Sequence, residues 1–418
     1  MRFGITWRRV RLFLLSSVLL ALVSYVGCDI WSARRLNNEI ARIEARYGSL
    51  NGPIESPEVP QTENRARLVT AAAALVNPGT AEERKALSAF ISDPVRKPLT
   101  PELRAYLGTN ADAIKIAREF VKYSRSSFGV DYGDQSAQVP LLQMRNLSNV
   151  LYLATLDAMD AGKPEDALAF IVAGLSASSA LRQEPQLITQ LIRIAAADLP
   201  INALQRLLEE STPSKAALEG VARALAENRD PAPMTIGLMG EVKVVHHVLA
   251  EREAGRGQDV MPWQFRGPLA LLMRPSLRLA HARYLEGVGK LLDLQTGPRP
   301  RGPAPGDERP PRWAIIDMMT GTFTSGLVRA IQSGDDIGGE QAAAEIAVAL
   351  RRYKLDRSAY PEALDSLAPE YLPALPLDPY TGKPPLYARA GDGFTLTASR
   401  SDAYTNTKRP TPTWKLMR

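Results

Sequence analysis

The stretch MRNLSNVLYLATLDAMDAGKPEDALAFIVAGLSASSAL, residues 144–181, decides the fold class. Its two halves show the apolar spacing of helices, at intervals of three and four residues, and AGKPED separates them. Gly162 ends the first predicted helix and Pro164 begins the second. The apolar positions are Leu147, Val150, Leu151 and Leu156 in the first half, and Ala167, Leu168, Ile171 and Leu175 in the second. The segment therefore predicts two antiparallel helices that small alanines allow to pack closely.

This hairpin resembles a tetratricopeptide unit. The pattern G-x-x-E-x-A-L of such a turn is matched by Gly162, Glu165, Ala167 and Leu168. No second copy follows at a fixed period, so two arrangements stay open for the helical body. It is either tetratricopeptide-like or an irregular bundle that contains one helical hairpin.

Composition favours helices over sheets and excludes several classes of protein. Of the 418 residues 45% are hydrophobic and 23% charged, which is typical of a globular chain, and aromatic residues make up 6%. The net charge of +6 is spread along the chain without a basic stripe, so no nucleic-acid partner is expected. A single cysteine excludes an intrachain disulfide framework and a cysteine-rich zinc site.

The N-terminus has the pattern of a membrane anchor. Residues 1–28 contain no acid, and four arginines precede the apolar run of residues 12–27. This charge bias predicts a cytoplasmic N-terminus with the bulk of the chain on the other side of a bacterial inner membrane, in the periplasm or otherwise extracytoplasmic. Trp7 and Trp31 flank the run as interfacial anchors would. Residues 1–31 are thus predicted to form an anchor or a lipoprotein signal.

The alternative to a plain anchor depends on Cys28. Gly27 and Cys28 resemble the end of the bacterial lipoprotein signal, in which a small residue precedes a lipidated cysteine, although Tyr25 departs from the aliphatic residue usual there. That resemblance implies a mature chain that is lipid-anchored at Cys28. The helical pattern running on through residues 30–50 favours an uncut anchor, with Cys28 as a small residue in a membrane helix.

Proline-rich segments divide the rest of the chain. We predict a membrane-proximal helix and hinge at 32–62, a helical body at 63–294, a linker at 295–312 and a C-terminal module at 313–418. In the module, SGDDIGGE (333–340) is expected to be the loop that enters a helix. The segments PPLYA and FTLTA, joined by RAGDG, predict a β-hairpin. The fold class is mainly α, with a small C-terminal α+β module.

This ending resembles the globular part of the type II secretion pseudopilins, particularly the major one. The shared features lie in order along the chain: Ala349, Leu350, Tyr353, Tyr360, Pro361, Leu364, Leu367, Pro376, Asp378, Pro379 and, next to them, Gly382. The resemblance implies a related fold for the module. The N-terminus lacks the prepilin cleavage site, and the tail does not reproduce the calcium-binding loop of that family. Taken whole, the chain resembles uncharacterised bacterial envelope proteins that combine an anchor, a helical body and such an ending.

The sequence offers little catalytic chemistry. His246 and His247 lie on one predicted helix and His281 on the next; the adjacent pair should point to different sides, one packed and one solvated. The motifs H-E-x-x-H, G-x-S-x-G and G-x-x-x-x-G-K-[ST] are absent. We therefore predict no catalytic residue, metal or cofactor.

The leading hypothesis for function is a membrane-anchored extracytoplasmic scaffold that binds a protein partner without catalysis. One alternative is a component or client of a type II secretion or pilus-like system. A second is a hydrolase that uses the histidines.

Overall fold

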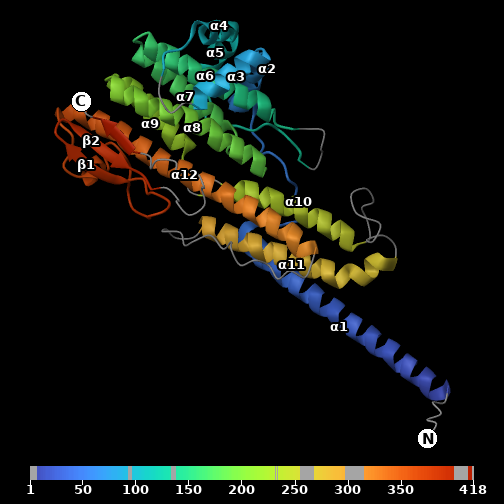
Figure 1. Ribbon diagram of the computed structural model, residues 1–418. Coiled ribbons are helices and arrows are strands. Elements are labelled where there is room, and N and C mark those ends of the chain that lie inside the picture. Colours follow the sequence, from blue (N-terminus) through green and yellow to red (C-terminus); the bar gives the residue numbers. More distant parts are fainter. Residues whose placement is uncertain are drawn as a thin grey trace. The chain divides into compact units, whose positions relative to one another are not determined.

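A computed structural model gives the architecture of the chain and describes residues 7–92, 97–132, 138–230, 232, 234–254, 268–296, 315–399 and 413–416. Within these ranges the protein is mainly helical, with twelve α-helices and one three-stranded antiparallel sheet (Figure 1). The predicted fold class is confirmed at this level. The described residues divide into two compact units, and each is considered by itself.

The first unit contains α1 (Trp7–Tyr47), α10 (Thr235–Glu253) from Glu241 onward, α11 (Pro268–Thr296) up to Leu292, and the start of α12 (Ile315–Arg357) up to Ser325. Helix α1 runs unbroken through Cys28, as the sequence predicts. Its segment Val10–Tyr47 is long and apolar enough to cross a membrane, and the apolar window has no buried residue. In the described residues α8 (Leu187–Glu210) passes the same test, but half of its window is buried, as in the core helix of a soluble domain. The structure thus has an N-terminal helix whose apolar window is uncovered, whereas Leu36 and Ile43 further along the same helix are buried.

The second unit contains a helical body and the C-terminal module. The helices of the body are α2 (Arg65–Leu75), α3 (Ala81–Ser92), α4 (Pro101–Thr109), α5 (Ala111–Ala117), α6 (Leu141–Asp160), α7 (Pro164–Ala180), α8 and α9 (Lys215–Asn228), with the short 3₁₀ turns η1 (Gln61–Glu63) and η2 (Phe120–Lys122). The module contains α12 (Ile315–Arg357) from Gly326 onward, η4 (Leu364–Leu367), β1 (Leu386–Ala390), β2 (Gly393–Thr397) and β3 (Thr413–Leu416).

Helices α6 and α7 form the predicted hairpin. Gly162 adopts φ 65°, and the amides of Gly162 and Lys163 donate to the carbonyls of Met159 and Ala158 at 3.0 and 2.9 Å, which closes the end of α6. Helix α7 packs on α6, α8 and α9 and supplies much of the core. A tetratricopeptide-like arrangement of the body beyond this hairpin stays a prediction.

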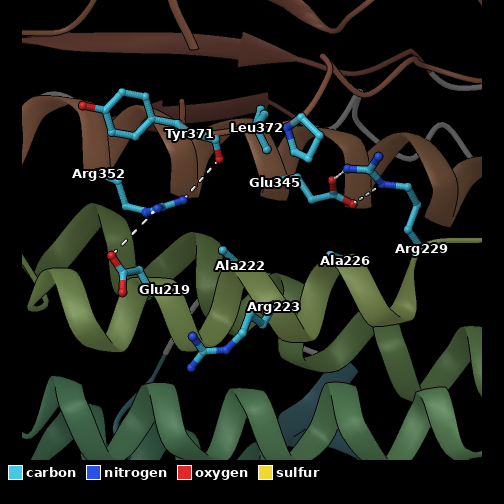
Figure 2. Close-up of a pocket in the computed structure, with 10 residues that line it drawn as sticks. Glu219, Ala222, Arg223, Ala226, Arg229, Glu345, Arg352, Tyr371 and Leu372 are labelled. Atoms are coloured by element: carbon cyan, nitrogen blue, oxygen red, sulfur yellow. Dashed lines mark hydrogen bonds and ion pairs between the residues drawn. The ribbon is translucent and has the colours of Figure 1, made fainter. Parts of the chain in front are cut away.

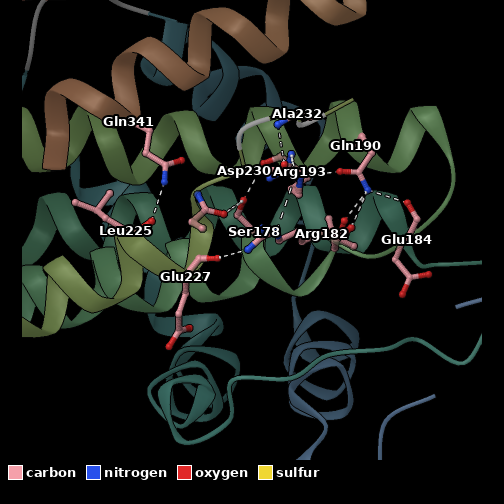
Figure 3. A network of polar contacts seen from close by, with 12 residues as sticks. Ser178, Arg182, Glu184, Gln190, Arg193, Leu225, Glu227, Asp230, Ala232 and Gln341 are labelled. Carbon is pink, nitrogen blue, oxygen red and sulfur yellow. Dashed lines mark hydrogen bonds and ion pairs between the residues drawn. The ribbon is translucent and has the colours of Figure 1, made fainter. Parts of the chain in front are cut away.

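A buried polar network ties the body to the module (Figure 3). The guanidinium of Arg193 donates to the side-chain oxygen of Gln190 at 2.7 Å and forms an ion pair with Asp230 at 3.4 Å. From α12, the Gln341 amide donates to the carbonyl of Leu225 at 2.7 Å, at the end of α9. Unpaired polar groups in such a core would each cost about 1–3 kcal/mol, so these bonds fix how α12 lies on α9.

The C-terminal module differs from the prediction at its start. Residues 333–340 lie inside α12 and do not form the expected loop, so that prediction is wrong. A side chain at Gly338 would meet the ring of Pro379, and one at Gly339 would meet the backbone of Ser399. Gly338 therefore allows close packing of the module on the helix, because a Cβ there would lie 3.1 Å from the ring of Pro379, and this contact offsets the weak helix propensity of glycine.

The sheet contains the predicted hairpin and one further strand. β1 pairs antiparallel with β2, and β2 pairs antiparallel with β3, with Phe394 opposite Leu416 and Leu396 opposite Trp414. All four side chains are buried, so β2 is the central and most buried strand. The third strand had not been expected from the sequence.

Candidate functional site

The exposed side of α9 separates two pockets that lie in the second unit. The first, about 310 Å³, lies between α9, α12 and residues 371–373 (Figure 2). The second, about 500 Å³, lies between α9, α7 and residues 118–121. Arg223 lines both pockets. We call these two pockets and the α9 residues between them the α9 surface.

The floor of the larger pocket is apolar and made of small side chains. Its α7 residues include Leu168, Ala169 and Val172, and its α9 residues include Ala217 and Gly220. No atom lies within 4 Å of the position that a Cβ would take at Gly220. A partner segment could therefore approach the helix backbone closely here.

Three of the four charged residues around this pocket are already held by the fold. Arg118 is paired with Asp166 at 3.2 Å, and Glu227 with the buried Arg65 at 2.9 Å. The carboxylate of Glu165 accepts from the amide and hydroxyl of Ser214, at 2.8 and 3.0 Å.

Arg223 is the exception. Its side chain is exposed, and among the described residues it has no hydrogen-bond or ion-pair partner. In Figure 2 its guanidinium points away from α12, whereas Arg229 and Arg352 pair with Glu345 and Glu219. The α9 surface thus offers one uncommitted cation beside an apolar floor, an arrangement suited to a carboxylate.

A second polar cluster lies in the first unit and contains two of the three histidines. His246 Nδ1 lies 3.1 Å from His281 Nε2, and His281 Nδ1 lies 2.9 Å from a Glu253 oxygen. At the other end, His246 Nε2 lies 3.3 Å from the side-chain oxygen of Asn51. His246 and His281 are buried and His247 is exposed, as expected for neighbours on a helix.

Polar contacts join these four side chains in one row, in the order Asn51, His246, His281 and Glu253. The Glu253 carboxylate accepts a hydrogen bond from His281 Nδ1–H, and the contact between the two imidazoles needs one donor and one acceptor nitrogen. Burial, and next the neighbouring His281, lower the pKa of His246; His247 acts in the same direction, whereas Glu44 and Glu253 oppose it.

The two histidines of this cluster are held away from solvent. His246 and His281 are 4% and 1% exposed, and none of their described polar contacts is with a hydroxyl or thiol. Within the described ranges, no group of three or more His, Cys, Asp or Glu side chains is arranged to hold a metal ion. The cluster joins α10 and α11 to Asn51, which lies four residues after the end of α1.

The residues that the sequence singled out near the N-terminus all lie on α1. Cys28 is exposed on the helix surface, in the helical register that continues to Tyr47. Trp7 and Trp31 are 79% and 54% exposed, and the Arg35 guanidinium lies over the Trp31 ring. All three side chains are available to a lipid phase.

The residues of the helical-hairpin turn serve packing and connection. Gly162 and Pro164 form the turn, and Ala167 and Leu168 are fully buried beneath it. Glu165 reaches the Ser214 cap of α9, so it links the hairpin to the helix of the α9 surface.

The residues of the pseudopilin-like motif lie in the core of the module. Leu350 and Tyr360 are buried, and Tyr360 packs edge-on against Phe394 with ring centres 4.9 Å apart. Tyr353 packs against Tyr371, and Pro361 accepts from the Tyr387 hydroxyl at 2.7 Å. These contacts fix the chain between α12 and the sheet.

Asp378 lies in the loop between Pro376 and Gly382 and holds its backbone in place. Its carboxylate accepts from the amides of Tyr380 and Thr381 and, at 2.5 Å, from that of Ser399, which lies two residues after β2. Pro376 and Pro379 flank it, and Gly382 turns the chain at φ 65°. Asp378 is thus committed to the fold.

Sequence reasoning missed Arg223, Glu253 and Asn51. Arg223 stands on a helix with other charged residues, and nothing in its local pattern distinguishes it from them. Glu253 and Asn51 are far from His281 in sequence, and only the packing of the helices brings them together.

Comparisons with models of protein families, with curated proteins and with solved structures find no match to this chain.

Proposed function

We propose that this protein is a membrane-anchored extracytoplasmic scaffold that binds a protein partner on its α9 surface and has no catalytic activity. The observation that carries the proposal is Arg223, an exposed and uncommitted cation shared by two pockets, one with an apolar floor. The partner we infer is a protein segment that carries an acidic side chain beside small apolar ones. Its carboxylate pairs with Arg223, and its apolar side chains lie against Ala169 and Gly220.

The test is site-specific photo-crosslinking of the tagged full chain in its native cells. A photo-reactive residue replaces Ala169, which is exposed in the larger pocket, and Gln143, exposed on α6 outside both pockets, is the control position. Cross-linked products are purified from detergent-solubilised membranes and identified by mass spectrometry. The proposal expects a product at Ala169 that does not form at Gln143.

Two substitutions then test the chemistry of binding. Arg223→Glu should abolish the product by charge repulsion, and Gly220→Leu should do so by filling the pocket, since a side chain at Gly220 enters open space. Arg145→Glu, an exposed arginine on α6, and Gly108→Leu, another glycine with open space around it, are the matched controls and should leave the product intact.

An exchange of charge identifies the acidic contact. Replacing the partner's acidic residue with lysine should restore the product with Arg223→Glu. A product that survives both Arg223→Glu and Gly220→Leu, or the absence of any product at Ala169, would overturn the binding proposal.

The anchor part of the proposal rests on α1 and is tested separately. We propose a bacterial inner-membrane location, which the arginines before the apolar run and the exposed apolar surface of α1 support. Mass spectrometry of the purified protein distinguishes the two forms of attachment. An intact peptide across Cys28 indicates a membrane helix, whereas a lipid-modified N-terminus at Cys28 indicates a lipoprotein.

A second candidate is a component or client of a type II secretion or pilus-like system. The observation in its favour is that α12 is a 43-residue helix leading into the small sheet of the module. Reproducible cross-linking to secretion or pilus subunits would favour this candidate, and their absence from the cross-linked material would count against it.

A further inference from the structure

The first turns of α11 lie beside the end of the apolar stretch of α1. Arg278 of α11 forms an ion pair with Asp29 at 2.9 Å, and Arg274 lies 4.0 Å from the same carboxylate oxygen. Asp29 directly follows the apolar run and Cys28. The two arginines therefore neutralise the first acidic group after the run, at the level where a membrane span would meet water.

The direction of α11 follows from a second set of contacts. Arg35 pairs with Glu286 at 3.2 Å, and Arg42, further along α1, donates to the Glu286 carbonyl at 3.4 Å. From Asp29 to Arg42 along α1, the contacted residues of α11 advance from Arg278 to Glu286, so residue numbers rise in the same direction in both helices. Helices α1 and α11 run parallel, as Figure 1 also shows. The N-terminal turns of α11 consequently point toward the apolar end of α1.

These turns expose apolar side chains. Leu272 is 62% exposed and Met273 37%, and they precede Arg278 by about 9 and about 7.5 Å along a helix that rises about 1.5 Å per residue. Pro275 interrupts the hydrogen bonding of α11 at this point, where a proline bends a helix. Apolar side chains beside arginines are the pattern of a helix that lies in a membrane interface.

From these contacts we propose that the N-terminal turns of α11 form a second membrane-binding element. Leu272 and Met273 insert into the lipid surface beside α1, next to the level at which Arg274 and Arg278 hold Asp29. The inference rests on the proposed role of α1 as a membrane anchor. It adds that the first unit is held against the bilayer at two places.

Fluorescence quenching in vesicles tests both contacts with lipid separately. The full chain is synthesised in a cell-free system without signal peptidase, in vesicles of phosphatidylcholine and phosphatidylglycerol. All variants carry Cys28→Ser, so that one introduced cysteine takes the environment-sensitive dye. Leu272→Cys reports on α11, Val18→Cys reports on the apolar run, and Lys290→Cys is an exposed control further along α11.

The expected result is a blue-shifted emission at positions 18 and 272 that nitroxide-labelled lipids quench, and an emission at position 290 that only aqueous iodide quenches. If position 18 is quenched by lipid but 272 behaves like 290, the inference is wrong and the anchor proposal stands. If position 18 is quenched by iodide and not by lipid, the anchor proposal fails and the inference fails with it.

Discussion

Two helical glycines of the second unit should respond in opposite ways to the same substitution. Gly240 belongs to α10 and Gly220 to α9. A Cβ at Gly240 would lie 1.6 Å from the carbonyl oxygen of Pro185 and 2.6 Å from its carbonyl carbon. These are backbone atoms, so no side-chain rotation relieves the overlap. At Gly220 a Cβ meets no atom within 4 Å.

The magnitudes follow from two competing effects. Alanine is favoured over glycine in a helix by about 1 kcal/mol, and this gain applies at both positions. Overpacking against backbone costs about 3 kcal/mol at the upper end of its usual range, and this applies only at Gly240. Gly220→Ala should therefore stabilise the second unit by about 1 kcal/mol. Gly240→Ala should destabilise it by about 2 kcal/mol.

Thermal unfolding of the detergent-solubilised full chain measures the difference. Trp414 is buried in the sheet, and in a background in which the other four tryptophans are replaced by phenylalanine its fluorescence follows the second unit. Far-ultraviolet circular dichroism follows the helices. For a unit of this size about 1 kcal/mol moves the midpoint by about 2–4 °C, so Gly220→Ala should raise it by that amount and Gly240→Ala lower it by about 4–8 °C. An unchanged or higher midpoint for Gly240→Ala would refute the close approach of α10 to Pro185.

Three further changes have defined outcomes. The pKa of His246 is lowered in the folded protein, so the unfolded chain binds the proton at a higher pH than the folded one. The stability of the first unit should therefore fall as the pH drops through the ordinary value of 6.5, by at most about 1.4 kcal/mol per pH unit. Thermal unfolding between pH 5 and 8 should show this slope, and His246→Gln should flatten it. Arg229→Met leaves the buried Glu345 carboxylate without its ion pair and should cost about 3 kcal/mol in urea unfolding, whereas the double change Arg229→Met, Glu345→Met should recover most of the loss. Thr80→Ala removes the hydroxyl that accepts from the Glu83 amide at 3.2 Å and should weaken α3 by about 1 kcal/mol, seen as faster amide exchange in α3 with the rest of the chain unchanged.

Local patterns in the sequence were sufficient for those features that depend on neighbours along the chain. Gly162 and Pro164 end one helix and begin the next because each has the backbone conformation that its position needs, and the structure has that hairpin. The apolar run before Cys28 and the alternation on both sides of RAGDG likewise correspond to an uncovered helix and a β-hairpin. Helix caps, turns and runs of hydrophobicity are short-range, so one sequence contains them in full.

Tertiary structure alone decided the features that join distant segments. SGDDIGGE has the composition of a loop, yet it lies inside α12, where the module packs closely against Gly338. β3 is a strand because its backbone pairs with the free edge of β2. Arg223 is a candidate contact because the other charged residues around the pocket have partners, and this depends on tertiary packing. Glu253 contacts His281 because α10 lies beside α11. Packing energy depends on which surfaces meet in space. Contacts between residues far apart in the chain therefore cannot be predicted from local patterns in one sequence.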